Sequence, residues 1–192
     1  MKIVGLTGGI ASGKSTVSQL LREAAIPVID ADRVAHDALL RGTLCYRLVV
    51  SRFGPHILDT STLEVDRAKL GTIVFSDGAA RKQLNGIMLP WIGLGLFFQV
   101  AFYFSAGAPV VVIDAPLLFE TRLDAACSLN VVVSVDKETQ LRRLVGRDAQ
   151  GEAEARRRIA AQPLSLAQKA ARADVVIDNS QGLDALRANV ER

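Results

Sequence analysis

The chain has 192 residues, of which 49% are hydrophobic and 22% carry a charge, a length that suits one compact domain with a full core. Its 23 lysines and arginines barely exceed its 20 acidic residues, which disfavours a nucleic-acid-binding surface. Cys45 and Cys127 lie far apart with no CxxC motif, so we expect buried thiols in a reducing compartment. No apolar leader precedes the first predicted strand, and we therefore expect a cytoplasmic protein.

A glycine-rich turn joins an apolar strand to a helix near the N-terminus. Gly8, four further residues, Gly13, Lys14 and Ser15 match the P-loop spacing, and the flanking apolar pattern disfavours a merely flexible loop. In this motif backbone N–H groups bind nucleotide phosphates, the lysine contacts β/γ oxygens and the serine ligates Mg²⁺. We expect positive φ at the glycines and a helix from near Lys14 whose N-terminus attracts anions. The predicted ATP-binding residues are Gly8, Gly9, Ile10, Ala11, Ser12, Gly13, Lys14, Ser15 and Thr16.

Two carboxylates follow the second predicted strand, which covers residues 27–30. Asp30 ends that strand, and Asp32 comes just before a helix that we expect to begin near Val34. Ligands bind at the carboxyl ends of parallel strands, so both side chains are candidates for a catalytic role. Ordinary turn or N-cap roles fit the residues about equally well.

A mainly helical insertion is predicted over about residues 34–108. The pattern is helical from Val34 to Val50, and another helix opens at residues 66–70. Residues 83–113 then contain no Asp, Glu, Lys or Arg. We expect a buried helix here, because Pro90 and Gly93 interrupt any uniform membrane-spanning segment. Membrane contact through residues 86–104 is the less favoured alternative.

Three more strands are predicted at residues 110–113, 130–136 and 173–178. Their alternation with helices predicts a doubly wound parallel sheet. Asp114 ends the first of the three, where it can order Mg²⁺ through water or hydrogen-bond the P-loop. Asn179 ends the last, where its amide can contact adenine or simply form a turn.

An arginine-rich segment lies between the last two predicted strands. Residues 137–147 read as a basic helix, and the charged stretch 151–158 is either a solvated helix face or part of a lid. A mobile lid over about residues 143–165 would exclude water and supply positive charge. Arg143 and Arg147 are therefore candidates for stabilising the transferred phosphoryl group.

Several motifs in this order resemble the dephospho-coenzyme A kinase family over nearly the whole chain. Besides the P-loop they are DAD at 30–32, DRAKL at 66–70, PLLFE at 116–120, RLVGRD at 143–148 and ADVVIDN at 173–179. The resemblance implies an α/β doubly wound parallel sheet with a P-loop NTPase core, a helical acceptor-binding insertion and a lid. The implied substrates are ATP and dephospho-CoA, with Mg²⁺ as cofactor.

By the same resemblance, Asp32 would orient the ribose 3′-hydroxyl and accept its proton. Lys14 and the backbone of residues 9–16 would hold the phosphates, Ser15 would ligate the metal, and Arg147 with Arg143 would meet the developing charge. The sequence differs from the family pattern at Leu89, where a histidine is usual, and in the short spacing at residues 162–164.

Two other functions stay open on the residues alone. One is a related P-loop small-molecule or nucleoside-monophosphate kinase with another acceptor. The other is a non-catalytic nucleotide-binding module, although no Asn-Lys-x-Asp element for guanine recognition is present in the sequence. The oligomeric state is not predicted.

Overall fold

A computed structural model describes residues 1–148 and 151–190. The chain folds into two compact units. The sheet unit comprises Met1–Asp30 and Tyr103–Arg192, and the helical unit comprises Ala31–Phe102. Each unit has its own hydrophobic core.

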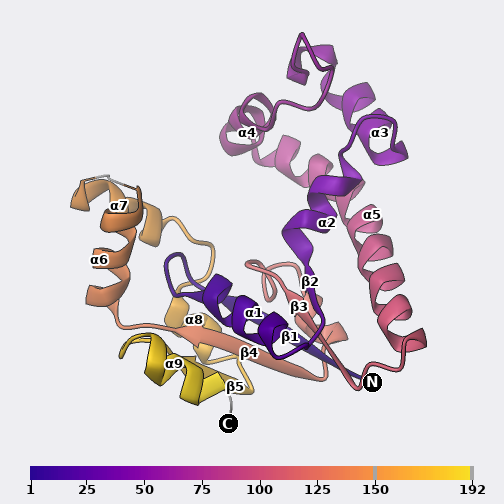
Figure 1. Ribbon diagram of the computed structural model, residues 1–192. Coiled ribbons are helices and arrows are strands. Elements are labelled where there is room, and N and C mark those ends of the chain that lie inside the picture. The colour runs from indigo at the N-terminus through magenta and orange to yellow at the C-terminus, as the bar shows by residue number, and fades with distance from the viewer. Residues whose placement is uncertain (149–150, 191–192) are drawn as a thin grey trace. The chain divides into compact units, whose positions relative to one another are not determined.

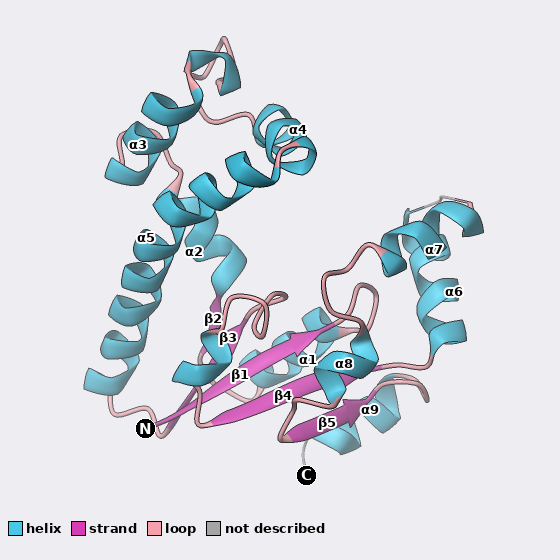
Figure 2. Ribbon diagram, turned by 180° about the vertical axis from the view of Figure 1, so that it is seen from behind, coloured by secondary structure: helices cyan, strands magenta, loops and turns pink. Residues whose placement is uncertain are grey.

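The sheet unit is built on one five-stranded parallel sheet with the strand order β2-β3-β1-β4-β5. Helices α1 and α9 cover one face (Figure 1), and α8 lies on the other (Figure 2). The predicted doubly wound sheet is thus confirmed, with strand ends within two residues of expectation. The strands are β1 (Lys2–Gly8), β2 (Val28–Asp30), β3 (Val110–Asp114), β4 (Leu129–Ser134) and β5 (Val175–Asp178). The helices are α1 (Lys14–Glu23), the 3-10 turn η2 (Leu123–Ala126), α6 (Lys137–Asp148), α7 (Glu152–Ala160), α8 (Leu166–Ala170) and α9 (Leu183–Val190).

Strand register brings the functional segments to one edge of the sheet. Asp30 pairs with Asp114 across β2 and β3, and Gly8 pairs with Val133 across β1 and β4. Val111, Val132 and other central residues are fully buried, as expected for parallel strands covered on both faces. The carboxyl ends of all five strands therefore meet where the P-loop leaves β1.

The helical unit contains two short helices where the sequence predicted one helix over Val34–Val50. That prediction is wrong, because Gly42 adopts φ +97° and Thr43 starts a new helix by accepting a hydrogen bond from the Tyr46 N–H. The helices are α2 (Ala31–Ala38), α3 (Leu44–Phe53), η1 (Pro55–Ile57), α4 (Arg67–Ser76) and α5 (Gly78–Ser105), whose last three residues belong to the sheet unit.

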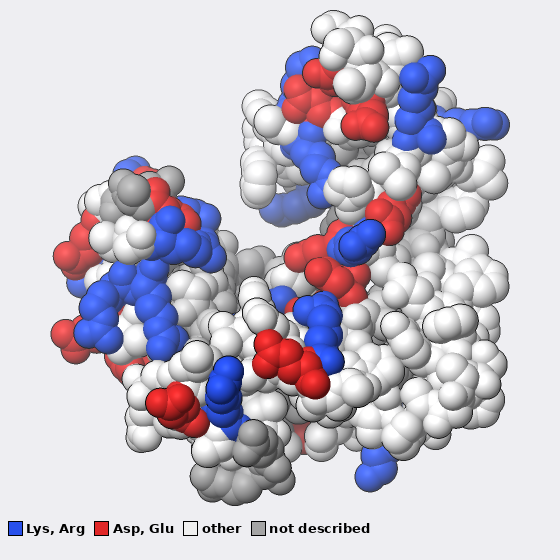
Figure 3. All heavy atoms as spheres, in the orientation of Figure 1, with Lys and Arg blue, Asp and Glu red and all other residues white. Residues whose placement is uncertain are grey.

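Helix α5 is not the buried helix that its composition predicted. It runs unbroken through Pro90 and Gly93, yet only Ala80 and Leu96 are buried along its 28 residues. Only 6% of the residues in its most apolar stretch are buried. From residue 83 to its end α5 has no lysine, arginine or acidic residue, and the surface along this part of the helix is white in Figure 3.

By length and composition, α5 is the one helix in the described ranges that could cross a membrane. Pairing between β2 and β3 argues against a single crossing, because the chain leaves the sheet at Asp30 and returns to the same sheet at Val110. A single span between those points would put two hydrogen-bonded strands on opposite sides of a bilayer. The helices that precede α5 in the helical unit have 8 to 10 residues, too few for a second span.

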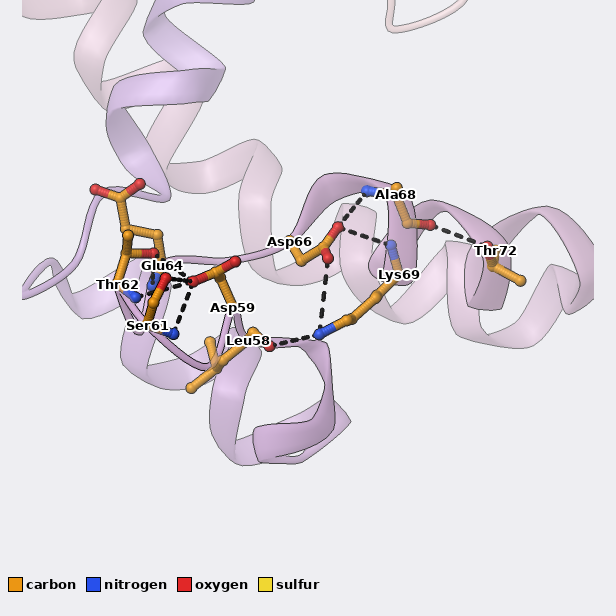
Figure 4. A network of polar contacts seen from close by, with 9 residues as sticks. All are labelled: Leu58, Asp59, Ser61, Thr62, Glu64, Asp66, Ala68, Lys69 and Thr72. Carbon is orange, nitrogen blue, oxygen red and sulfur yellow. Dashed lines mark hydrogen bonds and ion pairs between the residues drawn. The ribbon is translucent and has the colours of Figure 1, made fainter.

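Carboxylates hold the turn between η1 and α4 in the helical unit (Figure 4). Asp59 Oδ1 accepts hydrogen bonds from the backbone N–H and hydroxyl groups of both Ser61 and Thr62. Asp66 then caps α4 by accepting from the N–H groups of Ala68 and Lys69. Hydrogen bonds from the Ser61 hydroxyl, and then from the backbone of Thr62 and Ser61, hold the pKa of Asp59 well below its usual range.

We expect the Asp59 turn to make the free energy of unfolding depend on pH in the acidic range. The folded-state pKa is lowered, so the stabilisation is complete above the unfolded value of about 3.9 and is lost as the pH falls below it. Asp59→Asn should therefore be less stable than wild type at pH 6, and the difference should shrink as the pH falls from about 4 to about 2. Urea unfolding at several pH values measures this, and a constant difference would contradict the assignment.

Candidate active site

The P-loop has the conformation of an anion cradle. Gly13 adopts φ +91° immediately before α1, and Ala11 adopts φ +57° at the apex of the loop. The expected positive φ is wrong for Gly8 and Gly9, whose importance is steric. A Cβ on Gly8 would lie 2.5 Å from Ser12 Oγ, and one on Gly9 would lie 3.0 Å from the Gln140 amide nitrogen. The glycines therefore permit close packing around the loop.

Three side-chain amides hold the loop from outside. The Ile10 N–H donates to Gln162 Oε1 at 2.8 Å, and Gln140 Nε2 donates to the Ile10 carbonyl at 2.8 Å. Asn179, which is buried, donates from Nδ2 to the Ser12 carbonyl at 2.9 Å. The sequence analysis named Asn179 but missed both glutamines, because a lone glutamine in a helix or loop carries no motif signal. These bonds order the loop without any ligand.

Lys14 and Asp114 form an ion pair next to the loop. The Lys14 ammonium donates to Asp114 Oδ1, and the Ser18 hydroxyl donates to Asp114 Oδ2 at 2.5 Å. Asp114 is 5% exposed, so its charge is stabilised by these two partners. The sequence left two roles open for Asp114, ordering Mg²⁺ through water or hydrogen-bonding the P-loop. The structure shows the bond to the P-loop residue Lys14 directly.

The residues predicted to serve Mg²⁺ are compatible with an ion held mainly by nucleotide. Ser15 is exposed in the first turn of α1, and Asp114 lies at the end of β3. Among the described residues no group of three His, Cys, Asp or Glu side chains could hold a metal. Mg²⁺ commonly uses one or two protein oxygens together with phosphates and water, which this arrangement suits.

Asp32 belongs to the helical unit, where it lies in the first turn of α2. The helix begins at Ala31, three residues earlier than expected, so Asp32 is a helical residue. Asp30, two positions earlier, ends β2 in register with Asp114. Asp32 is therefore two residues from the carboxyl end of β2.

A small pocket of about 190 Å³ lies beside the P-loop. The Arg143 guanidinium lies 3.9 Å from the position that a Cβ on Gly13 would take, and the Asn179 amide is closer still. Leu183 and Leu186 from α9 supply its apolar lining. A planar, uncharged group with polar edges fits this combination of guanidinium, amide and apolar side chains.

Arginines gather on α6 and α7, as the blue atoms over these helices in Figure 3 show. Asp148 pairs with Arg147 of the same helix, α6, at 2.7 Å, and its pair with Arg158 joins α6 to α7. The hydrogen bond from Arg147 is the main cause that lowers the pKa of Asp148, and it raises the pKa of Arg147 in turn. The proposed lid, residues 143–165, includes positions 149–150, which lie outside the described residues.

A buried ion pair, also missed by the sequence analysis, lies behind the loop. The Lys169 side chain is 3% exposed and that of Glu120 is 13% exposed, and their charged atoms are 3.0 Å apart. Both oxygens of Glu120 lack a properly angled hydrogen bond, so the pair is an ionic contact. The Lys169 ammonium also donates to the Pro116 carbonyl, which accepts from the Thr7 hydroxyl of β1. This network ties α8 to the strands that carry the P-loop.

Known proteins resemble this chain closely in sequence and in fold. The family model described as dephospho-CoA kinase matches residues 2–185. A dephospho-CoA kinase of Arabidopsis thaliana is 50% identical over 192 residues, spanning all of this chain and 82% of the plant protein. A Geobacillus kaustophilus dephospho-CoA kinase is 49% identical over 177 residues, or 92% and 87% of the two chains. The dephospho-CoA kinase structure from Campylobacter jejuni is 26% identical, with a TM-score of 0.73 over 98% and 93% of the chains.

We expect Lys169→Met to destabilise the protein by about 3–5 kcal/mol, because it leaves the Glu120 carboxylate buried without its counter-charge. Adding Glu120→Gln should recover a large part of that loss, since the double variant has no uncompensated charge. Urea unfolding of the two single variants and the double variant measures the coupling. A cost below about 1 kcal/mol for Lys169→Met would show that the pair is solvated and contributes little.

Proposed function

Because the chain belongs to the dephospho-CoA kinase family, we propose that it transfers the γ-phosphoryl group of ATP to the ribose 3′-hydroxyl of dephospho-CoA, giving coenzyme A and ADP. The observation that carries this proposal is the preformed P-loop, held by Gln140, Gln162 and Asn179 at the carboxyl edge of a parallel sheet. Phosphoryl transfer depends on positioning and charge stabilisation, and a rigid cradle supplies both.

In this proposal the P-loop binds the triphosphate of ATP. The backbone N–H groups of residues 9–16 and the positive end of α1 face the phosphates. The Lys14 ammonium exchanges its contact with Asp114 for β/γ-phosphate oxygens, and Asp114 keeps its bond from Ser18. Bound Mg²⁺ would neutralise phosphate charge, with the Ser15 hydroxyl as a ligand and Asp114 as a partner of its water.

The pocket beside Gly13 is suited to the adenine of ATP. The Arg143 guanidinium can stack on one face of the base, and Leu183 and Leu186 offer apolar contact. Asn179 already donates to Ser12, so its remaining amide groups are the ones that can contact the base edge. The same residue would thus link base binding to the shape of the phosphate loop.

Asp32 is proposed to orient the acceptor and to receive its proton. A carboxylate in hydrogen-bond reach of the 3′-hydroxyl positions its oxygen for in-line attack and accepts the proton as the new bond forms. Asp32 follows the end of β2 by two residues in the chain. Arg147 is proposed to leave Asp148 and meet the charge that develops on the transferred group.

We expect Asp32→Asn and Lys14→Ala to lower turnover by different routes. Asp32→Asn should reduce kcat about 10²–10⁴-fold while ATP affinity stays near wild type, because the amide cannot accept the proton. Lys14→Ala should reduce turnover about a hundredfold or more and should also weaken ATP binding. Calorimetry with a non-hydrolysable ATP analogue measures ATP affinity, and steady-state kinetics with dephospho-CoA measures kcat. Together they separate the effects of the two substitutions.

Asp30→Asn is the matched control, since Asp30 is the neighbouring carboxylate. Near-normal turnover by Asp32→Asn, or a larger loss from Asp30→Asn, would show that Asp32 is not the base.

Arg147→Ala should lower kcat more than it weakens ATP binding, because a lid arginine contacts the transition state more strongly than the ground state. A reduction of about a hundredfold in kcat, with ATP affinity changed less than threefold, is the expected result. Arg143→Ala should show the reverse pattern if Arg143 binds the base. Equal losses of affinity and turnover in Arg147→Ala would make Arg147 a ground-state binding residue instead.

A further inference from the structure

The outward side of α5 has no role in the chemistry described so far. The opposite side packs on the core of the helical unit through four partly buried apolar residues, which are Leu84, Ile87, Met88 and Trp91. Facing away from them are four exposed residues, separated by seven, four and seven positions, which are Gly86, Gly93, Phe97 and Phe104. Such spacings keep residues on one side of a helix, as in the seam of a coiled coil. We call these four residues the outer seam.

The outer seam is small at one end and bulky at the other. Beyond the local helix backbone, no atom of the described residues lies within 4 Å of the position that a Cβ would take on Gly86 or Gly93. Packing within the single chain therefore does not require these glycines, although glycine is unfavourable in the interior of a helix. Phe97 and Phe104 are 63% and 66% exposed. The seam thus carries two open positions followed by two exposed rings.

The order of small and large residues makes the outer seam complementary to itself. Gly93 lies two positions before residue 95 and Phe97 lies two positions after it. Gly86 and Phe104 lie nine positions before and nine positions after the same residue. A twofold axis level with residue 95 would therefore set each ring of one antiparallel helix over a glycine of the other, as knobs fit into holes.

Charge and area favour a second copy of the chain over a lipid surface as the partner. From residue 83 onward α5 has no charged side chain, so pairing two copies removes no charge from water. Helices that lie on membranes typically carry lysine and arginine on a polar face, which this part of α5 lacks. The four rings of a paired seam contribute about 400–650 Å² of buried area. Leu89 and Leu94, each 45% exposed on either side of the seam, extend it toward the about 1,000 Å² of a specific interface.

We propose that the protein forms a symmetric dimer in which two copies of α5 pack antiparallel along the outer seam. Phe97 of one copy lies over the partner's Gly93, and Phe104 lies over the partner's Gly86. The contact is isologous, so each of these residues contributes twice to one interface. The dimer uses none of the residues assigned to phosphoryl transfer, so this inference stands or falls separately from the proposed function.

Sedimentation velocity of the full-length protein, from about 1 to about 100 μM, tests the dimer directly. The expected result is a rise with concentration from the 20.6 kDa of one chain to twice that mass. Flotation with vesicles of phosphatidylcholine and phosphatidylserine tests the rival partner. The protein should stay in the unbound fraction, because the seam is matched to a second helix.

Phe97→Ala should raise the dimer dissociation constant about a hundredfold, because the substitution removes two rings from one interface. Phe75→Ala is the matched control, since Phe75 is 87% exposed on α4 and lies outside the seam. It should change the dissociation constant less than threefold. Both rings are largely exposed in the single chain, so neither substitution should prevent folding, and circular dichroism checks this.

An exchange of the two facing residues tests the antiparallel register. Gly93→Phe alone should disrupt the dimer, because two rings would then compete for one place. The double variant Gly93→Phe with Phe97→Gly should dimerise again to within about tenfold of wild type, because each ring again meets a glycine and the composition is unchanged.

Four results would overturn the proposal. The first two are a monomer throughout the concentration range and flotation of the wild-type protein with the vesicles. The others are equal effects of Phe97→Ala and Phe75→Ala on the dissociation constant, and a double variant that dimerises no better than Gly93→Phe alone.

Discussion

The structure depends on keeping a short loop of backbone N–H groups open for an anion. Such a loop leaves polar groups unpaired within itself, so other parts of the chain must hold its shape. Gln140, Gln162 and Asn179 do this from α6, the segment before α8 and the end of β5, positions more than 120 residues away in sequence. The parallel sheet brings these elements to the loop, and the Lys169–Glu120 pair fastens α8 behind it. With this strand order, all three amides reach the loop that follows β1.

Local patterns made much of this predictable from the sequence. The P-loop is a contiguous motif between an apolar strand and a helix, and its spacing alone indicated the residues from Gly8 to Thr16. The continuous apolar runs of β3 and β4 are typical of strands buried on both faces, so a parallel sheet followed from them. Since parallel strands end at one edge, the grouping of Asp30, Asp114 and Asn179 was also predictable.

Other features depend on tertiary contacts that no local pattern records. Gln140 and Gln162 act on Ile10 only because the fold brings them there, and a glutamine has no distinctive spacing. The exposure of α5 was missed because apolar composition predicts burial only where another element covers the helix. The break at Gly42 was missed because a helical pattern continues on either side of it. Conversely, Gly8 and Gly9 were recognised correctly as P-loop glycines but for a conformational reason, whereas the structure shows a steric one.

The central claim is that ATP bound at the P-loop gives its γ-phosphoryl group to a ribose hydroxyl. Identification of the phosphorylated product tests this claim most directly. The protein would be incubated with Mg·ATP and, separately, with dephospho-CoA and with nucleoside monophosphates. Mass spectrometry and phosphorus NMR would then locate the new phosphate. The account predicts that dephospho-CoA gains one phosphate as a 3′-monoester, with one ADP formed for each. Phosphorylation of a monophosphate at its 5′-phosphate, or ATP hydrolysis without an acceptor product, would contradict it.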